Sequence, residues 1–203
     1  MIILGLTGSI GMGKTTVTEQ FASLGAATSN ADTIVHGLLT ADEEVITQIG
    51  ERFPEAVGKG GVNRQKLGDL VFGNAQHIKW LERILHPKVK AAEVAFAQAA
   101  EAAGRWLVVM DIPLLFETGA EKRMDYTAVV SAPYEVQRER VLARAGMTEE
   151  KFEAILALQV PDEEKRRRAD FVIPTDQGMD ASLAVVKTIM DTLKLKEQKR
   201  NEG

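Results

Sequence analysis

The chain has 203 residues, no cysteine and a net charge of −4. Its length suits one compact domain with a sizeable core, the lack of cysteine excludes disulfides and thiolate metal sites, and the acidic balance argues against a nucleic-acid surface. The apolar first residues lack the basic segment and cleavage site of a signal peptide, and no apolar run approaches the roughly 20 residues of a membrane span, so we expect a cytoplasmic enzyme without nucleic-acid or membrane partners.

The first predicted element is an apolar strand over residues 1–7, which leads directly into a glycine-rich loop. Residues 8–15, GSIGMGKT, follow the pattern G-x-x-x-x-G-K-[ST], and an amphipathic helix comes next. The glycines let backbone N–H groups turn inward around phosphate oxygens, and the helix N-terminus adds donors and a positive dipole. Such a loop can also be a simple turn, but the strand before it and the helix after it predict a nucleoside triphosphate site.

Two side chains of this loop have the chemistry that a triphosphate site needs. Lys14 can reach the β- and γ-phosphates as a positive charge. The hydroxyl of Thr15 can occupy one coordination position of Mg²⁺. The loop therefore predicts magnesium as well as a nucleoside triphosphate.

A carboxylate follows the second predicted strand. The helix that starts at Lys14 ends at Gly25, and residues 26–29 lie where a second parallel strand belongs, despite their poor strand propensity. Ligands of open parallel sheets bind at the carboxyl ends of the strands, so Asp32 could accept the proton of an attacking hydroxyl. It could equally be a helix N-cap, which Asn30 or Asp32 could provide, and its position alone leaves both interpretations open.

Residues 34 to about 103 have a mostly helical pattern, interrupted by a glycine-rich, hairpin-like stretch at 57–62. His86 stands before Pro87, which predicts the end of a helix there and a structural histidine. The three histidines of the chain do not have the spacing of metal ligands.

Three continuous apolar runs predict strands buried on both faces, at residues 106–110, 127–130 and 171–173. Helical patterns cover residues 134–145, 151–158 and about 180–195, and the polar end at 196–203 is expected to fray as a solvated tail. Strands that alternate with helices indicate an α/β fold with a parallel sheet and right-handed crossovers.

Asp111 closes the strand at 106–110. A carboxylate at this point is typical of the magnesium side of P-loop enzymes, but it could also belong to a buried turn, and the sequence leaves the two open. For Leu115 and Phe116, which follow it, burial in such a turn is the favoured interpretation.

Arg140 and Arg144 are one turn apart on the segment QRERVLARAG and share a helix face. Their guanidinium groups could converge on phosphate oxygens as part of a closing lid. An ordinary solvated face paired with Glu135 and Glu139 would have the same pattern. The run at 162–168, DEEKRRR, has acids first and bases last, as a helix start and end prefer.

These motifs together resemble the dephospho-CoA kinase family over nearly the whole chain. The resemblance rests on LTGSIGMGKTTV at the loop, ADTIVH after the second strand, VNRQKL, VFGN, ILHPKV, DIPLLFE, QRERVLAR followed by GMTEE, and ADFVIPT. It implies a P-loop NTPase fold of the nucleoside-monophosphate-kinase type, with a five-stranded parallel sheet flanked by helices, a helical acceptor-binding insertion and a lid. It also implies transfer of a phosphoryl group from ATP to the ribose 3′-hydroxyl of dephospho-CoA.

The resemblance assigns roles to further residues. Asp32 matches the aspartate on the acceptor side, Arg140 and Arg144 match lid arginines, and Arg64 and His86 match positions of the acceptor domain. The chain departs from the family in three places. These are Asn30 in place of the first aspartate of an Asp-x-Asp pair, Ser9 in place of a glycine, and Thr175 where an asparagine near the adenine is usual.

We therefore expect one P-loop kinase domain over residues 1–203. Its core covers about 1–35, 106–137 and 160–195, its insertion about 36–105 and its lid about 138–159. The catalytic residues expected are Lys14, Arg140 and Asp32. The residues expected to bind the nucleotide are Gly11, Met12, Gly13, Lys14, Thr15, Thr16, Arg144 and Thr175.

The remaining expectations concern the oligomeric state, the substrates and the alternative functions. The protein is a monomer or a weak homo-oligomer that acts on the small molecules ATP and dephospho-CoA. The nearest alternative is another small-molecule kinase, such as a nucleoside monophosphate kinase. A GTPase switch is disfavoured, because the guanine-reading sequence Asn-Lys-x-Asp does not occur in the chain.

Overall fold

The computed structural model describes residues 1–201, and the chain divides into two compact units. The sheet unit contains Met1–Ser29 and the chain from Ala97 onward, and the helical unit is Asn30–Phe96. We expected the helical segment at about 36–105. The observed division differs because the last helix of this segment, α5 (Ala75–Ala102), contributes residues to both units.

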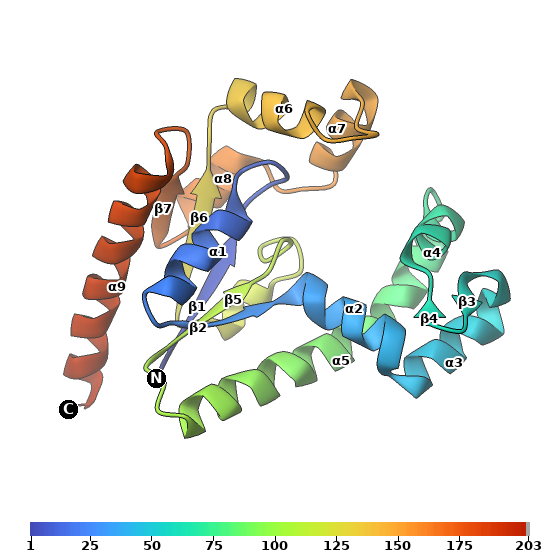
Figure 1. Ribbon diagram of the computed structural model, residues 1–203, viewed down its shortest axis with the longest axis horizontal. Helices are drawn as coiled ribbons and strands as arrows, with labels where there is room; N and C mark the ends of the chain where they lie inside the picture. Colours follow the sequence, from blue (N-terminus) through green and yellow to red (C-terminus); the bar gives the residue numbers. More distant parts are fainter. Residues whose placement is uncertain (202–203) are drawn as a thin grey trace. The chain divides into compact units, whose positions relative to one another are not determined.

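The sheet unit is built on five parallel strands in the order β2-β5-β1-β6-β7 (Figure 1). Their bounds are β1 (Ile2–Thr7), β2 (Ala27–Asn30), β5 (Leu107–Asp111), β6 (Tyr126–Ser131) and β7 (Phe171–Pro174). The central strands are buried on both faces, which is why their sequences are continuous apolar runs and not alternating ones. The α/β fold with a five-stranded parallel sheet is confirmed.

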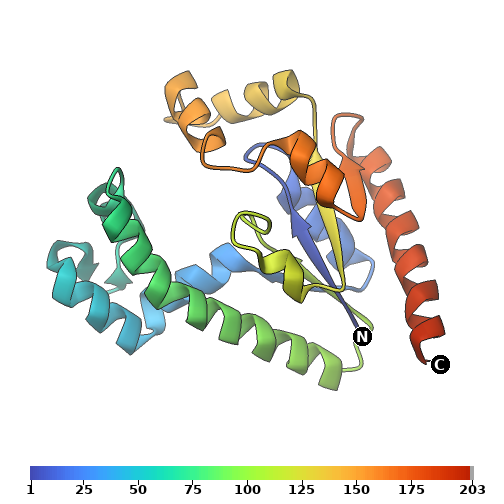
Figure 2. The ribbon, with the colours of Figure 1, turned by 180° about the vertical axis from the view of Figure 1, so that it is seen from behind.

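Helices cover both faces of this sheet. α1 (Lys14–Ser23) and α9 (Met179–Asn201) pack against each other, and α8 (Asp162–Arg168) lies behind β6, as Figure 2 shows from the back. The core joins side chains of α1 and α9 to those of the strands; from the two helices it takes Val17, Phe21, Val186, Ile189, Met190 and Leu193. Two further helices, α6 (Tyr134–Leu142) and α7 (Glu149–Leu156), follow β6.

The end of α9 differs from the expectation. Residues 196–201 continue the helix, and positions 202 and 203 lie outside the described residues. Lys196 lies over the ring of Tyr126, and Arg200 pairs with Asp125 at 3.2 Å. The amino group of Met1 also lies 3.0 Å from Glu197. The frayed, solvated tail predicted here is wrong up to residue 201, because these contacts attach the last turns to the sheet unit.

The helical unit contains four α-helices, a 3₁₀ turn and a small hairpin within its described residues. The helices are α2 (Ala31–Ala41), α3 (Glu43–Arg52), α4 (Arg64–Val71) and the first part of α5. Between α3 and α4 lie the 3₁₀ turn η1 (Pro54–Ala56) and the hairpin strands β3 (Val57–Gly58) and β4 (Gly61–Val62). The hairpin confirms the turn expected at 57–62. The side chains of Asn30, Asp42 and Asn63 cap α2, α3 and α4. Each accepts a hydrogen bond from the backbone N–H of the residue three positions later.

The helical unit has an apolar core of its own, which includes Leu39, Val45, Ile49, Leu67 and Leu85. Asp42, the cap of α3, also bonds Lys88 of α5 at 2.9 Å and so connects two helices. No helix among residues 1–201 combines the length and apolarity needed to cross a membrane.

The helix end predicted at His86-Pro87 is wrong, because α5 continues through Pro87. Proline removes one backbone donor and crowds the carbonyl four residues before it, which normally kinks or ends a helix. Here the turns on either side are held by packing, through Leu85 before the proline and Ala97 and Ala100 after it. Tertiary packing therefore outweighs the local signal, and His86 is an exposed residue of this helix.

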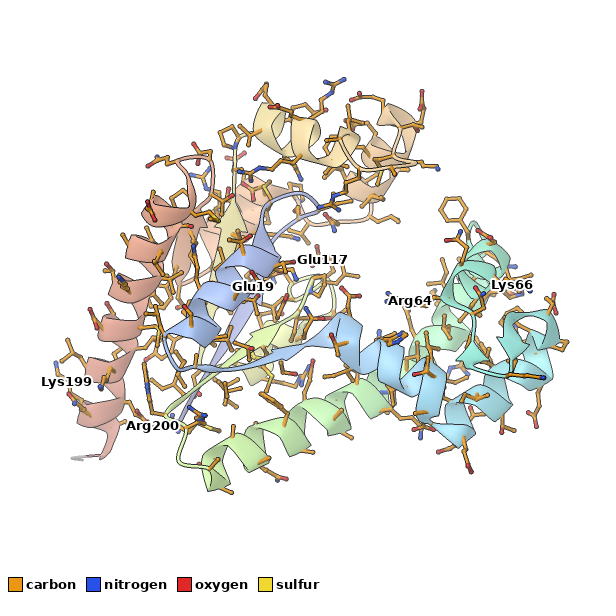
Figure 3. All side chains as sticks on the ribbon, in the orientation of Figure 1. Glu19, Arg64, Lys66, Glu117, Lys199 and Arg200 are labelled. Carbon is orange, nitrogen blue, oxygen red and sulfur yellow. The ribbon has the colours of Figure 1, made fainter. Side chains whose placement is uncertain are left out.

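The charged run at 162–168 forms α8, with acids in its first turn and bases in its last, as predicted. One of its bases is not on a solvated face. Lys165 is fully buried, and its Nζ lies 2.9 Å from Oε1 of Glu117 in the segment after β5 (Figure 3 labels Glu117). The same oxygen accepts a hydrogen bond from the backbone N–H of Val160 at 2.8 Å. A buried ion pair thus connects the segment after β5 to α8.

Removal of one partner of this pair should destabilise the protein strongly. In Lys165→Ala, Glu117 would remain buried without its counter-charge, and such changes cost about 3–5 kcal/mol. Urea unfolding should therefore show a large loss of stability for Lys165→Ala. Lys187→Ala, at an exposed lysine of α9, should stay within about 0.5 kcal/mol of wild type.

A double variant tests the cause of this loss. Glu117→Leu with Lys165→Met removes both charges and keeps much of the volume, so it should be more stable than Lys165→Ala alone. A Lys165→Ala protein as stable as the Lys187→Ala control would contradict a structural role for the pair.

Candidate active site

The glycine-rich loop connects β1 to α1, and two of its glycines have a left-handed backbone. Gly11 has φ 80° and Gly13 has φ 88°, a region in which other residues are strained. Gly13 is also the N-cap of α1 and forms no side-chain cap hydrogen bond. The first N–H groups of α1 therefore face the loop without a side-chain acceptor at the cap, which suits a phosphate group.

Lys14 forms an ion pair with Asp111 at the end of β5. Asp111 is fully buried and is the last residue of β5, where it pairs in register with Leu6 of β1. Of the two interpretations that the sequence left open for it, the buried turn is therefore wrong. The second carboxylate oxygen of Asp111 accepts a hydrogen bond from Thr18 Oγ1 at 3.2 Å. The Lys14 ammonium is thereby held at the carboxyl end of the central strands.

A cavity of ≈ 460 Å³ lies beside the loop. Its walls come from the loop and the start of α1, from α6 and the turn after it, and from the segment after β7 and the start of α9. The lining residues are Gly11, Gly13, Thr16, Arg140, Arg144, Thr175, Asp176, Gly178, Met179 and Ser182. This volume is within the range of small-molecule sites, and its two arginines give it positive charge.

Arg140 is fixed by Thr175 in the wall of this cavity. Its guanidinium donates to Thr175 Oγ1 at 3.0 Å and to the Thr175 carbonyl at 2.7 Å. Thr175 Oγ1 in turn donates to the carbonyl of Met12 at 2.7 Å. The solvated-face interpretation is therefore wrong for Arg140, because the partner of its guanidinium is Thr175, directly after β7, and not Glu135 or Glu139.

The neighbouring Arg138 has a different partner. It forms a two-armed ion pair with Glu149, the first residue of α7, and this carboxylate raises the pKa of the guanidinium. The pair connects α6 to α7. Arg144 is exposed and lines the cavity. The assignment of residues 138–159 to a lid remains a prediction.

Asp32 lies in the first turn of α2, within the helical unit. The cap of this helix is Asn30, whose side chain accepts from the N–H of Thr33 at 3.0 Å, so the N-cap interpretation of Asp32 is wrong. Asp32 is exposed, and Arg64 of α4 (labelled in Figure 3) lies 3.3 Å from its Oδ1. Its carboxylate is thus available for chemistry, and its role as a base remains a prediction.

The residues around the loop can provide what magnesium needs. Mg²⁺ usually binds one or two protein oxygens and takes the rest from phosphates and water. The side chain of Thr15 is exposed at the start of α1, and Asp111 offers one carboxylate beside Lys14 and Thr18. No group of three or more acidic, histidine or cysteine side chains that could hold a metal occurs in residues 1–201.

Three residues of this region were not expected from the sequence. Thr18 is one helical turn after Lys14, and this spacing could have indicated that both reach Asp111. Gln137 is a buried polar residue one turn before the buried Val141, so its position on the inward face of α6 was a usable signal. Lys165 had no such signal, because its partner Glu117 lies 48 positions earlier in the chain.

The family model described as dephospho-CoA kinase matches residues 2–181. Among curated proteins, the dephospho-CoA kinase of Mesorhizobium japonicum is 52% identical over 194 residues, which cover 96% of this chain and 98% of that protein. The dephospho-CoA kinase of Agrobacterium fabrum is 51% identical and covers 95% of this chain and 98% of that protein.

Solved structures also match nearly the whole chain. A crystal structure of a Thermus thermophilus protein superposes with a TM-score of 0.82 at 36% identity and covers 95% of this chain and 97% of that one. Dephospho-CoA kinase from Campylobacter jejuni superposes with a TM-score of 0.65 at 26% identity and covers 94% and 96% of the two chains. A shikimate kinase from Acinetobacter baumannii, at 14% identity and a TM-score of 0.53, shares the fold.

Substitution of two loop glycines by alanine should lower the melting temperature by different amounts. Both have a positive φ and lose similar backbone freedom, but a Cβ at Gly11 would lie 2.5 Å from Cγ2 of Val141 and 3.0 Å from the carbonyl of Gln137. At Gly13 the nearest atom, Oγ1 of Thr175, is 3.4 Å away. Gly11→Ala should therefore lower the melting temperature more than Gly13→Ala, by several degrees, since overpacking costs about 1–3 kcal/mol.

Thermal unfolding of the two variants, matched in composition, provides the measurement. Equal melting temperatures would mean that the loop does not pack against α6 as closely as described.

Proposed function

We propose a reaction and a set of residue roles for this chain, which belongs to the dephospho-CoA kinase family. The enzyme transfers the γ-phosphoryl group of ATP to the ribose 3′-hydroxyl of dephospho-CoA and releases coenzyme A and ADP. The observation that carries this proposal is the match to the family over residues 2–181. It is supported by the glycine loop, whose lysine lies next to a buried carboxylate, and by the adjoining cavity with two arginines.

The nucleotide phosphates bind along residues 11–16. Backbone N–H groups of the loop and of the first turn of α1 point toward the phosphate oxygens, and the helix dipole adds to the attraction. Arg144 and Thr175 line the same cavity and contact the rest of the nucleotide. Thr175 is already engaged with Arg140 and Met12, so it shapes this wall more than it reads the adenine.

Lys14 and Arg140 neutralise the phosphoryl group in transfer. Phosphoryl transfer depends mainly on positioning and on charge stabilisation, because negative charge spreads over the oxygens of the moving group. Asp111 and Thr175 hold these two cations through charged or bidentate contacts. The cations are therefore oriented before reaction, and little reorganisation is needed.

Asp32 is the general base of the reaction. The 3′-oxygen attacks the γ-phosphorus, the bond from this phosphorus to the β–γ bridging oxygen breaks, and the hydroxyl proton passes to the Asp32 carboxylate. Asn30 cannot take this part because a neutral amide does not take up the proton, and its side-chain oxygen caps α2. Arg64, 3.3 Å from Asp32, places a positive charge beside this carboxylate and attracts an anionic acceptor.

Magnesium belongs to the proposed reaction. Thr15 would hold it through its hydroxyl, and Asp111, which contacts Lys14 and Thr18, offers a carboxylate in the same region. When bound, the ion would offset the negative charge of the phosphates.

Three expectations about organisation remain proposals. The enzyme works in the cytoplasm, it is a monomer or a weak homo-oligomer, and residues 36–105 and 138–159 serve as acceptor-binding insertion and lid of the core at 1–35, 106–137 and 160–195. The division of the chain at Asn30 and Phe96 supports a separate acceptor-binding segment.

The substrate assignment is tested by ADP release across a panel of acceptors. We expect dephospho-CoA to be turned over in preference to AMP and to other nucleoside monophosphates. Lys14→Ala provides the background, since the loss of a charge that stabilises the transferred group should lower kcat by at least about 10²- to 10³-fold. Preferred turnover of AMP would indicate a nucleoside monophosphate kinase and contradict the proposal.

Asp32→Asn separates chemistry from binding. Asn is similar in shape and cannot accept the proton, so kcat should fall by about 10²- to 10⁴-fold. The Kd of ATP should remain near the wild-type value, because the nucleotide is held by the loop. The matched control is Asp69→Asn, at an aspartate of α4 in the same unit whose partner is Gln65, and it should leave kcat unchanged.

An Asp32→Asn enzyme with the kcat of the control would remove Asp32 from the mechanism. A fall in melting temperature together with kcat would instead indicate a folding defect, so melting temperature is measured on both variants.

A further inference from the structure

The peptide groups on either side of Ile10, in the glycine loop, are each bonded by a glutamine side chain. Gln137 Nε2 donates to the carbonyl of Ile10 at 2.7 Å. The N–H of Ile10 donates to Oε1 of Gln159 at 3.3 Å. The two glutamines come from opposite ends of the α6–α7 segment, since Gln137 is in the first turns of α6 and Gln159 follows α7.

The first hydrogen bond determines where the N–H of Gly11 points. The Ile10 carbonyl and the Gly11 N–H belong to one trans peptide group, in which the two point in opposite directions. Because Gln137 holds the carbonyl on the side of α6, the N–H of Gly11 is directed away from α6. Gly11 lines the cavity proposed for the nucleotide, so this N–H is available to a phosphate oxygen.

The second hydrogen bond fixes the preceding peptide group in the same way. The N–H of Ile10 faces Gln159, so the carbonyl of Ser9 points the other way, and it accepts a hydrogen bond from the N–H of Met12 at 3.2 Å. The two glutamines thus specify the orientation of successive peptide groups at the tip of the loop.

A side-chain constraint is needed here because the loop itself is permissive. Gly11 has a positive φ, and glycine populates several backbone regions at little cost, so the peptide before it could turn over and present its carbonyl to an anion. Gln137 opposes this: it is 3% exposed, and a rotated peptide would leave its buried amide unpaired. An unpaired buried donor is costly.

Gln159 is itself held in place by its neighbour in the chain. The N–H of Val160 donates to Glu117, whose carboxylate pairs with the buried Lys165. At the other end, α6 also bears Arg140. One continuous segment therefore carries both the groups that orient the loop and an arginine of the cavity.

We propose that Gln137 and Gln159 are positioning residues that set the peptide orientation of the loop at Ile10 and so turn the Gly11 N–H toward a bound phosphate. This inference rests on the part of the proposed function that places ATP phosphates at the loop, and not on the identity of the acceptor.

The test compares substitutions that keep or remove each hydrogen bond. Gln137→Met and Gln159→Met remove one bond each at similar side-chain length, and both should raise the Kd of an ATP analogue by about 5- to 100-fold. The acceptor KM should stay within twofold. Gln198→Met, at an exposed glutamine of α9, is the matched control and should leave the nucleotide Kd unchanged.

Substitution by glutamate distinguishes a donor from an acceptor. A carboxylate at position 159 can still accept from the Ile10 N–H, so Gln159→Glu should bind the nucleotide more tightly than Gln159→Met when both are measured at high salt, where the added charge is screened. A carboxylate at position 137 cannot donate to the Ile10 carbonyl, so Gln137→Glu should be no better than Gln137→Met. A purely structural role would not produce this opposite behaviour.

Amide hydrogen exchange on the wild-type protein provides a test that needs no variant. The N–H of Ile10 should be protected without nucleotide, whereas that of Gly11 should become protected only when the ATP analogue binds. The proposal is overturned if Ile10 exchanges as fast as an exposed peptide, or if the Met variants bind the analogue within twofold of wild type. If these results hold while dephospho-CoA is not phosphorylated, the proposed function fails and the positioning role stands.

Discussion

The sheet unit depends on one close approach, that of the glycine loop to α6. At Gly11 there is no space for a side chain, because a Cβ would lie 2.5 Å from Val141. The backbone of the loop can therefore touch the helix directly, and hydrogen bonds from Gln137 to Ile10 and from Ala132 to the sulfur of Met12 follow from this contact. The shape of the loop is thus a tertiary property, determined by the surface against which it packs.

Polar partners hold three cations in fixed positions around the loop and α8. Asp111 holds Lys14 on the β5 side, Thr175 holds Arg140 on the β7 side, and Glu117 holds Lys165 beneath α8. Charges taken out of water are expensive unless they are paired, so each of these cations has few alternative positions. In the first two cases the fixed cation belongs to the proposed nucleotide site. In the third it stabilises the segment from which Gln159 reaches the loop.

The helical unit is stabilised differently from the sheet unit. Its first three helices are short and are stabilised by caps at Asn30, Asp42 and Asn63 and by a compact apolar core. The cap at Asn30 has a functional consequence, because it fills the role that Asp32 could have had and leaves the Asp32 carboxylate exposed beside Arg64. The departure from the family pattern at position 30 is therefore compatible with a base at position 32.

The sequence by itself determined the features that depend on neighbouring residues. The apolar runs predicted the central strands, the pattern GSIGMGKT predicted the phosphate loop, and the motifs between them predicted the family to which the chain belongs. Only the tertiary structure decided the rest. It showed that α5 passes through Pro87, that α9 continues past residue 195, and that Lys165, Gln137 and Thr175 have partners far away in the chain. The reason is physical: propensities and caps act within a few residues, whereas the pairing of a buried polar group depends on which distant segment packs against it.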